Sequence, residues 1–295
     1  MMTGAWRKTL LLARMVKIEH SVFALPFAYL GMLWAAGGWP GWRIFLALTV
    51  AMVAVRSFAM AVNRLVDLPF DARNPRTGTR PLVTGELGRG ETGLFILACA
   101  LVFTAACALL NPLCLMLAPF ALVWSALYSF TKRITLLCHF FLGSVLGLAP
   151  LAGWLAVTPL LTLPAVLLGI GVVFWVGGFD ILYACQDADF DRREGLHSLP
   201  AALGLPTSLA LSTFSHVVAG LMFLLAGWAA GAGLVYTGCA LAVWVVLLAE
   251  HRLISAEDPF RIDRAETPLR KALSRSLCPS RTPGPAPSAA RSSGP

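Results

Sequence analysis

The chain has 295 residues, of which 58% are hydrophobic and only 13% are charged. A soluble domain of this length could not bury so much apolar surface, whereas a bilayer needs about 20 apolar residues for each spanning helix. The composition therefore excludes an ordinary soluble globular domain. It predicts an all-α, polytopic membrane protein.

Eight apolar stretches are long enough to be predicted as membrane spans. With the N-terminus inside, all but two of the 23 basic residues fall in cytoplasmic segments. This bias makes the net charge of +8 a signal of topology, and it argues against a nucleic-acid partner. The eight predicted spans are Ser21–Gly38, Ile44–Val62, Gly93–Leu110, Leu113–Phe130, Leu136–Ala156, Pro164–Ala184, Leu209–Ala229 and Leu234–Ala249.

Two acidic clusters follow the second and sixth predicted spans. The first contains Asn63, Asp67 and Asp71, and the second contains Asp187, Asp189 and Asp191, although only 15 residues of the whole chain are acidic. Residues four apart lie on one face of a helix. Magnesium takes one or two carboxylates and completes its coordination with water and phosphate oxygens. Because both spans run in the same direction, the two clusters are predicted to lie on the cytoplasmic side and to hold a diphosphate between Mg²⁺ ions.

Basic and aromatic residues lie close to these clusters. Tyr128 and Lys132 are one helical turn apart at the inner end of the fourth span. Arginine side chains suit phosphate oxygens because the guanidinium presents a planar fork of donors. The loop after the first cluster carries three such residues, Arg73, Arg76 and Arg80.

Three further residues bear on the geometry. Pro69 removes a backbone donor, so the helix is expected to end or kink between Asp67 and Asp71. Arg56 and Asp180 lie within predicted spans, where ionisable groups are costly and usually functional. Arg56 would be placed to hold a carboxylate of a substrate.

Simpler interpretations remain open for each feature alone. A single acidic cluster at a helix end is often only a solvated interface, and Tyr128 with Lys132 fits an ordinary cytoplasmic interface. Arg56 or Asp180 could form a structural pair between helices. A polytopic transporter would explain the spans and these two residues, but it would not explain two carboxylate clusters on one face.

Four segments carry a resemblance to a known family: KIEHSVFALPFAYLG, NRLVDLPFDARNPRTGTRPL, YSFTKR and YACQDADFDRREGLHSLP. They resemble the UbiA superfamily of intramembrane aromatic prenyltransferases, and most closely its 4-hydroxybenzoate polyprenyltransferase-like branch. The resemblance covers about residues 10–265. It implies nine transmembrane helices around a central cavity, with Asn63, Asp67 and Asp71 as the first magnesium–diphosphate motif and Asp187 and Asp191 as the second.

The resemblance further implies a function. The expected reaction is the Mg²⁺-dependent transfer of a polyprenyl group from its diphosphate to an aromatic acid such as 4-hydroxybenzoate. A dihydroxynaphthoic acid is the alternative acceptor, and an inactive homologue without the last helix is a further alternative. The expected catalytic residues are the four motif aspartates and Lys132. The expected substrate-binding residues are Asn63, Arg56, Lys17, Arg76, Arg80, Tyr128, Asp180 and Arg192.

The chain is predicted to have three parts. Residues 1–20 form a cytoplasmic N-terminal segment and residues 21–254 form the transmembrane prenyltransferase domain. Residues 255–295 become polar and rich in proline and serine where the ninth helix should begin, so they are expected to be disordered or the product of a frameshift. The expected location is a bacterial inner membrane, with the active site facing the cytoplasm.

Overall fold

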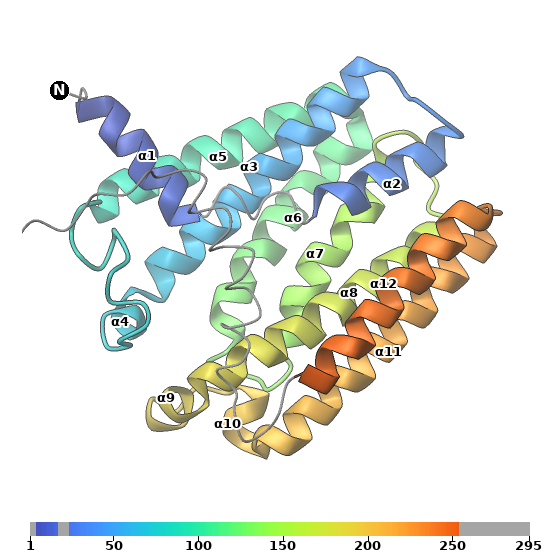
Figure 1. The fold of residues 1–295 in the computed structure, drawn as a ribbon. Coiled ribbons are helices and arrows are strands. Elements are labelled where there is room, and N and C mark those ends of the chain that lie inside the picture. Colours follow the sequence, from blue (N-terminus) through green and yellow to red (C-terminus); the bar gives the residue numbers. More distant parts are fainter. Residues whose placement is uncertain (1–3, 17–23, 254–295) are drawn as a thin grey trace, which may run out of the picture.

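The computed structural model describes residues 4–16 and 24–253, and all regular secondary structure in these ranges is helical (Figure 1). The all-α prediction is therefore confirmed. Lys17 and the predicted tail of residues 255–295 lie outside the described residues. The helices are α1 Gly4–Val16, α2 Leu25–Ala36, α3 Trp42–Val66, α4 Leu68–Asp71, α5 Arg89–Leu110, α6 Pro112–Thr131, α7 Cys138–Leu155, α8 Leu163–Ala184, η2 Cys185–Asp187, α9 Ala188–Arg193, α10 Leu199–Leu203, α11 Leu205–Ala229 and α12 Leu234–Leu253.

Seven helices of the described chain are long and apolar enough to cross a membrane, where eight had been predicted. The difference is the first predicted span, in which α2 has only 12 residues. At 1.5 Å per residue such a helix is about 18 Å long, against about 30 Å for the hydrocarbon core of a bilayer. Gly37 ends α2 in a left-handed conformation, with φ of 62°. The remaining long spans are α3, α5, α6, α7, α8, α11 and α12.

Glycines allow the central helices to approach each other closely. Helix α8 packs against both α7 and α11, and α2 packs against α7. A Cβ atom at Gly143 of α7 would collide with the carbonyl group of Val173 in α8, and one at Gly153 would collide with the carbonyl group of Ala28 in α2. Small residues at such contacts are typical of helix packing in membranes, where apolar surface alone does not drive association.

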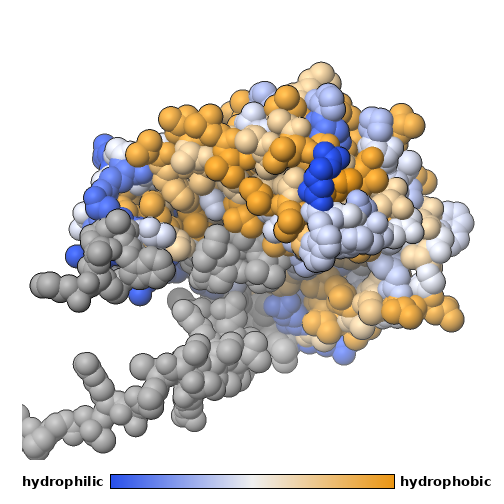
Figure 2. Space-filling view, turned by 90° about the horizontal axis from the view of Figure 1, so that it is seen from above, coloured by the Kyte–Doolittle hydropathy of each residue, from blue (hydrophilic) through white to orange (hydrophobic). Residues whose placement is uncertain are grey.

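The outward faces of the bundle are apolar. Leu101, Met116, Trp228 and Val235 are all exposed, although each is a large hydrophobic residue. Figure 2 shows broad apolar areas across the described surface in this view. A water-soluble protein rarely exposes so much apolar surface, so these faces suit lipid.

The two acidic segments lie at the same end of the bundle, as predicted. Helices α4 and α9 both project from that end in Figure 1. Ion pairs connect the loop after α4 to the second segment. The Nη1 atom of Arg73 lies 2.8 Å from Oε2 of Glu194. Arg76 likewise pairs with Asp187. Segments more than 100 residues apart are thereby held together around one site.

Candidate active site

The first cluster lies where α3 gives way to α4. Asp67 separates the two helices, and Pro69 occupies the first turn of α4, so the helix ends where the sequence predicted. The backbone N–H of Asp67 donates to Asn63 O, and that of Asp71 donates to Asp67 O, both at 2.8 Å. The three side chains therefore keep a helix-like spacing through the break. The amide of Asn63 also donates from Nδ2 to Asp67 Oδ2 at 2.7 Å.

The second cluster lies where α8 tightens into η2 and then continues as α9. Asp187 ends η2, and Asp191 lies within α9 with none of its surface exposed. Lys132, the residue after α6, places its Nζ 2.8 Å from Asp191 Oδ1. Neither oxygen of Asp191 accepts a well-directed hydrogen bond from the described residues. A buried carboxylate with unused acceptor capacity is costly unless a cation is close.

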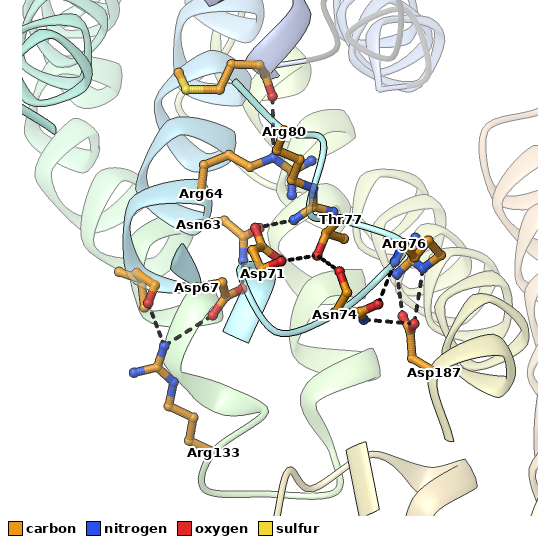
Figure 3. A network of polar contacts seen from close by, with 12 residues as sticks. Asn63, Arg64, Asp67, Asp71, Asn74, Arg76, Thr77, Arg80, Arg133 and Asp187 are labelled. Carbon is orange, nitrogen blue, oxygen red and sulfur yellow. Dashed lines mark hydrogen bonds and ion pairs between the residues drawn. The ribbon is translucent and has the colours of Figure 1, made fainter. Parts of the chain in front are cut away.

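Each of the four motif aspartates is paired with a basic side chain, and three of these pairs are drawn in Figure 3. The Arg76 Nε atom donates to Asp187 Oδ1 at 3.0 Å, and Asn74 Nδ2 donates to the same oxygen at 3.3 Å. The pairs are Asp67 with Arg133 at 3.2 Å, Asp71 with Arg80, Asp187 with Arg76, and Asp191 with Lys132. Each of the four carboxylates thus has one cation as its partner.

The surroundings shift the pKa of several of these groups, among them Asp67 and Lys132. Burial raises the pKa of the Asp67 carboxyl, and the hydrogen bond from Arg133 only partly opposes this effect. Burial alone would lower the pKa of the Lys132 ammonium, but the nearby Asp191 carboxylate outweighs it, and the pKa lies above its ordinary value. Lys132 therefore stays positively charged at neutral pH.

An apolar pocket of about 90 Å³ lies between α3, α6 and α7. Arg56 from α3 and Tyr128 from α6 are among its few polar lining residues, together with Ser125. The structure thus brings two of the expected substrate-binding residues into one cavity. The rest of the lining is almost entirely aliphatic and aromatic, which suits an apolar substrate.

Asp180 lies outside this set of pocket residues and has a partner that the sequence did not reveal. His139 of α7 is almost fully buried, and its Nδ1 lies 2.6 Å from Asp180 Oδ2. The backbone N–H of Leu199 donates to His139 Nε2 at 3.2 Å. Since Nε2 accepts, Nδ1 carries the proton that is donated to Asp180. The pair connects α7, α8 and the beginning of α10.

One expected binding residue is directed elsewhere. Arg192 is exposed, and its Nη1 donates to Asp189 Oδ1 at 3.0 Å on the outer side of α9. The structure therefore does not bring Arg192 together with the motif aspartates. The reason is that α9 buries Asp191 and turns its next residue outward.

Three residues of the site were absent from the sequence prediction: Asn74, Arg133 and His139. Arg133 donates from Nη2 to both Val66 O and Asp67, and its guanidinium lies 4.9 Å from the ring centre of Phe70. Its position directly after Lys132 was the available signal. His139 had no signal, because a single histidine within an apolar stretch is usually structural.

Comparison with known proteins extends these observations. The model of the UbiA prenyltransferase family matches residues 24–270. A 4-hydroxybenzoate octaprenyltransferase from Shewanella pealeana is 28% identical over 247 residues, which cover 84% of this chain and 85% of that protein. The enzyme of the same name from Shewanella piezotolerans is 30% identical over 227 residues, 77% of this chain and 79% of that protein.

Solved structures agree in fold. A UbiA homologue from Aeropyrum pernix K1 superposes with a TM-score of 0.75 at 35% identity, covering 80% of this chain and 88% of that one. A UbiA homologue from Archaeoglobus fulgidus, bound to DMAPP and Mg²⁺, has a TM-score of 0.68 at 19% identity, covering 82% and 86%. The family model spans more than half of the chain, and the helical fold is shared with the solved UbiA homologues. The chain is an integral membrane protein that belongs to the UbiA prenyltransferase family.

Proposed function

We propose that this prenyltransferase transfers a polyprenyl group from its diphosphate to an aromatic acid, with 4-hydroxybenzoate as the leading acceptor. The observation that carries the proposal is the meeting of two aspartate clusters and four cations at one end of the bundle, near an apolar pocket that contains Arg56. The names of the Shewanella relatives support the acceptor, and the DMAPP bound to the Archaeoglobus protein supports the donor.

The residues fit a divalent metal. No three acidic, histidine or cysteine side chains of the described chain converge to enclose an ion by themselves. Magnesium does not require such a cage, because it binds one or two carboxylates and takes its other ligands from water and substrate phosphates. The Oδ2 atom of Asp191, which accepts no hydrogen bond from the described residues, provides such a ligand position. We assign the metal-binding role to Asn63, Asp67, Asp71, Asp187 and Asp191.

In the proposed reaction the bond between the first prenyl carbon and the diphosphate oxygen breaks, and the diphosphate leaves with the electron pair. Bound Mg²⁺ supplies Lewis-acid stabilisation of that leaving group. Lys132, Arg76 and Arg80 supply further positive charge to its oxygens. A ring carbon ortho to the acceptor hydroxyl forms the new carbon–carbon bond, and the ring then loses a proton.

The apolar pocket defines the acceptor end in this proposal. Arg56 binds the acceptor carboxylate, and Tyr128 lies beside the allylic end of the donor. The aliphatic lining excludes water, which would otherwise trap the allylic cation. Lys17 and Asp180 are proposed to bind substrate as well, with Asp180 oriented by His139.

The proposed location is the inner membrane of a bacterium, with the aspartate clusters on the cytoplasmic side. The relatives from Shewanella species support a bacterial source. The concentration of basic residues in the loops that carry the clusters supports the orientation.

The test is a prenyl-transfer assay on the full-length protein in nanodiscs, with a polyprenyl diphosphate, Mg²⁺ and a panel of aromatic acids that includes 4-hydroxybenzoate and a dihydroxynaphthoic acid. Mass spectrometry identifies the prenylated product. We expect Asp67→Asn and Asp191→Asn each to reduce turnover by about 100-fold or more. The matched control is Asp189→Asn, which changes an exposed aspartate of the same segment. Full activity in both motif variants would refute the proposal, and a product formed only from the naphthoic acid would reassign the acceptor.

A further inference from the structure

A second pocket lies on the far side of Asp71 from the second aspartate cluster. It has a volume of about 60 Å³, room for several water-sized groups, and is bounded by α1, the end of α3 and the loop after α4. Its charged lining residues are Arg14, Arg64, Arg80 and Asp71. Three guanidinium groups therefore face one carboxylate, which leaves a local excess of positive charge.

Arg64 is the buried member of this group. Only 8% of its surface is exposed, and its Nε donates to the carbonyl oxygen of Met15 at a long 3.4 Å. Among the described residues, no hydrogen bond or ion pair involves its two terminal nitrogens. These two nitrogens are not among the fully buried polar atoms, so they remain available as donors to a ligand in the pocket.

The neighbouring arginine increases this imbalance. Figure 3 shows the guanidinium groups of Arg64 and Arg80 side by side, one from α3 and the other from the loop. They are close enough to repel each other, and Arg80 has Asp71 as its partner. Arg14, from α1, adds a third positive charge to the pocket without an ion pair to any described residue. An anion between these side chains would satisfy the unused donors of Arg64 and relieve the repulsion.

We propose that this pocket is an anion subsite that adjoins the aspartate site, with which it shares Asp71 and Arg80, and that it binds a phosphate-type group through Arg14 and Arg64. Two ligands share this chemistry: inorganic diphosphate released beside Asp71, and the phosphate of an anionic lipid headgroup at the interface where α1 lies. Binding of an anion in this pocket does not depend on which aromatic acid is the acceptor. The small size of the pocket excludes a complete prenyl substrate.

The test measures binding to the full-length protein in a non-ionic detergent with EDTA present, so that binding through Mg²⁺ cannot contribute. The probes are inorganic diphosphate and a soluble short-chain phosphatidylglycerol, each titrated by calorimetry. We expect at least one of them to bind, and Arg14→Gln and Arg64→Gln each to weaken that binding by about tenfold or more. Which probe binds distinguishes the two sources.

Two controls keep the result specific. Arg7→Gln removes a charge from the same helix at a residue that pairs with Glu86 and does not line the pocket, so binding should be unchanged. Lys132→Gln should also leave the metal-free binding unchanged. If Arg64→Gln lowers the melting temperature, anion binding is compared between the wild type, Arg64→Lys and Arg14→Gln, in which the replaced arginine is exposed. The proposal is overturned if neither probe binds, or if binding depends on Lys132 and not on Arg14.

Discussion

Replacing either partner of the Lys132–Asp191 ion pair should destabilise the protein, but by different amounts. The Asp191 side chain is 1% exposed, whereas that of Lys132 is 37% exposed. Lys132→Met leaves a buried carboxylate without its cation. In contrast, Asp191→Asn leaves an ammonium group that can turn toward water. We therefore expect the lysine variant to lose more stability than the aspartate variant.

The magnitude follows from the burial of the pair. Breaking a fully buried ion pair by removing one partner costs about 3–5 kcal/mol. Because Lys132 is partly solvated, solvent screening reduces the expected loss for Lys132→Met to about 2 kcal/mol. In a protein of this size such a loss lowers the melting temperature by about 4–8 °C. For Asp191→Asn the expected decrease is less than half of this value.

The assay is thermal unfolding of purified protein in detergent, followed by intrinsic tryptophan fluorescence. Arg192→Gln breaks the exposed pair with Asp189 and should leave the melting temperature within about 1 °C of the wild type. Added Mg²⁺ should increase the stability of Lys132→Met more than that of the wild type, because the metal ion at Asp191 then replaces the missing cation. A melting temperature for Asp191→Asn as low as that of Lys132→Met would refute the reasoning.

Three further predictions concern other parts of the site and the bundle. Arg56→Gln should raise the KM for the aromatic acid by about tenfold while the KM for the prenyl diphosphate stays unchanged; an equal rise in both would contradict a role at the acceptor end. His139→Phe should lower kcat, because Asp180 then loses the hydrogen bond that orients it. His139→Gln, which can still donate a hydrogen bond, should have a kcat between those of His139→Phe and the wild type in steady-state kinetics. Gly153→Val should reduce the yield of monodisperse protein in size-exclusion chromatography, because the new side chain would collide with the backbone of α2. Gly93→Ala places its side chain in open space and should leave the yield unchanged. Equal yields of the two variants would refute the close packing of α7 on α2.

The helical architecture could be predicted because its signals are local. Apolar stretches of 18 or more residues identify spans wherever they occur, and seven of the eight predicted spans correspond to long helices. The break at Pro69 was equally local, because proline removes a donor from its own turn. The first predicted span is the exception, because within it the helix α2 extends only from Leu25 to Ala36, between Ala24 and Gly37.

The site itself could be predicted only in part. The spacing of the aspartates and the direction of the spans placed both clusters at one end. The cations that pair with them depend on contacts between distant segments: Arg76 and Asp187 are 111 positions apart. The same limitation explains why Arg192 was expected in the site and His139 was not.

The sequence by itself determined the membrane class, the helical fold and the two carboxylate motifs, because hydropathy and the four-residue spacing are properties of short segments. Only the tertiary structure decided which charges face each other. It pairs Lys132 with Asp191, turns Arg192 outward, and brings Arg64 beside Arg80. The physical reason is that burial and ion pairing depend on the packing of several helices at once, and no single segment encodes that packing.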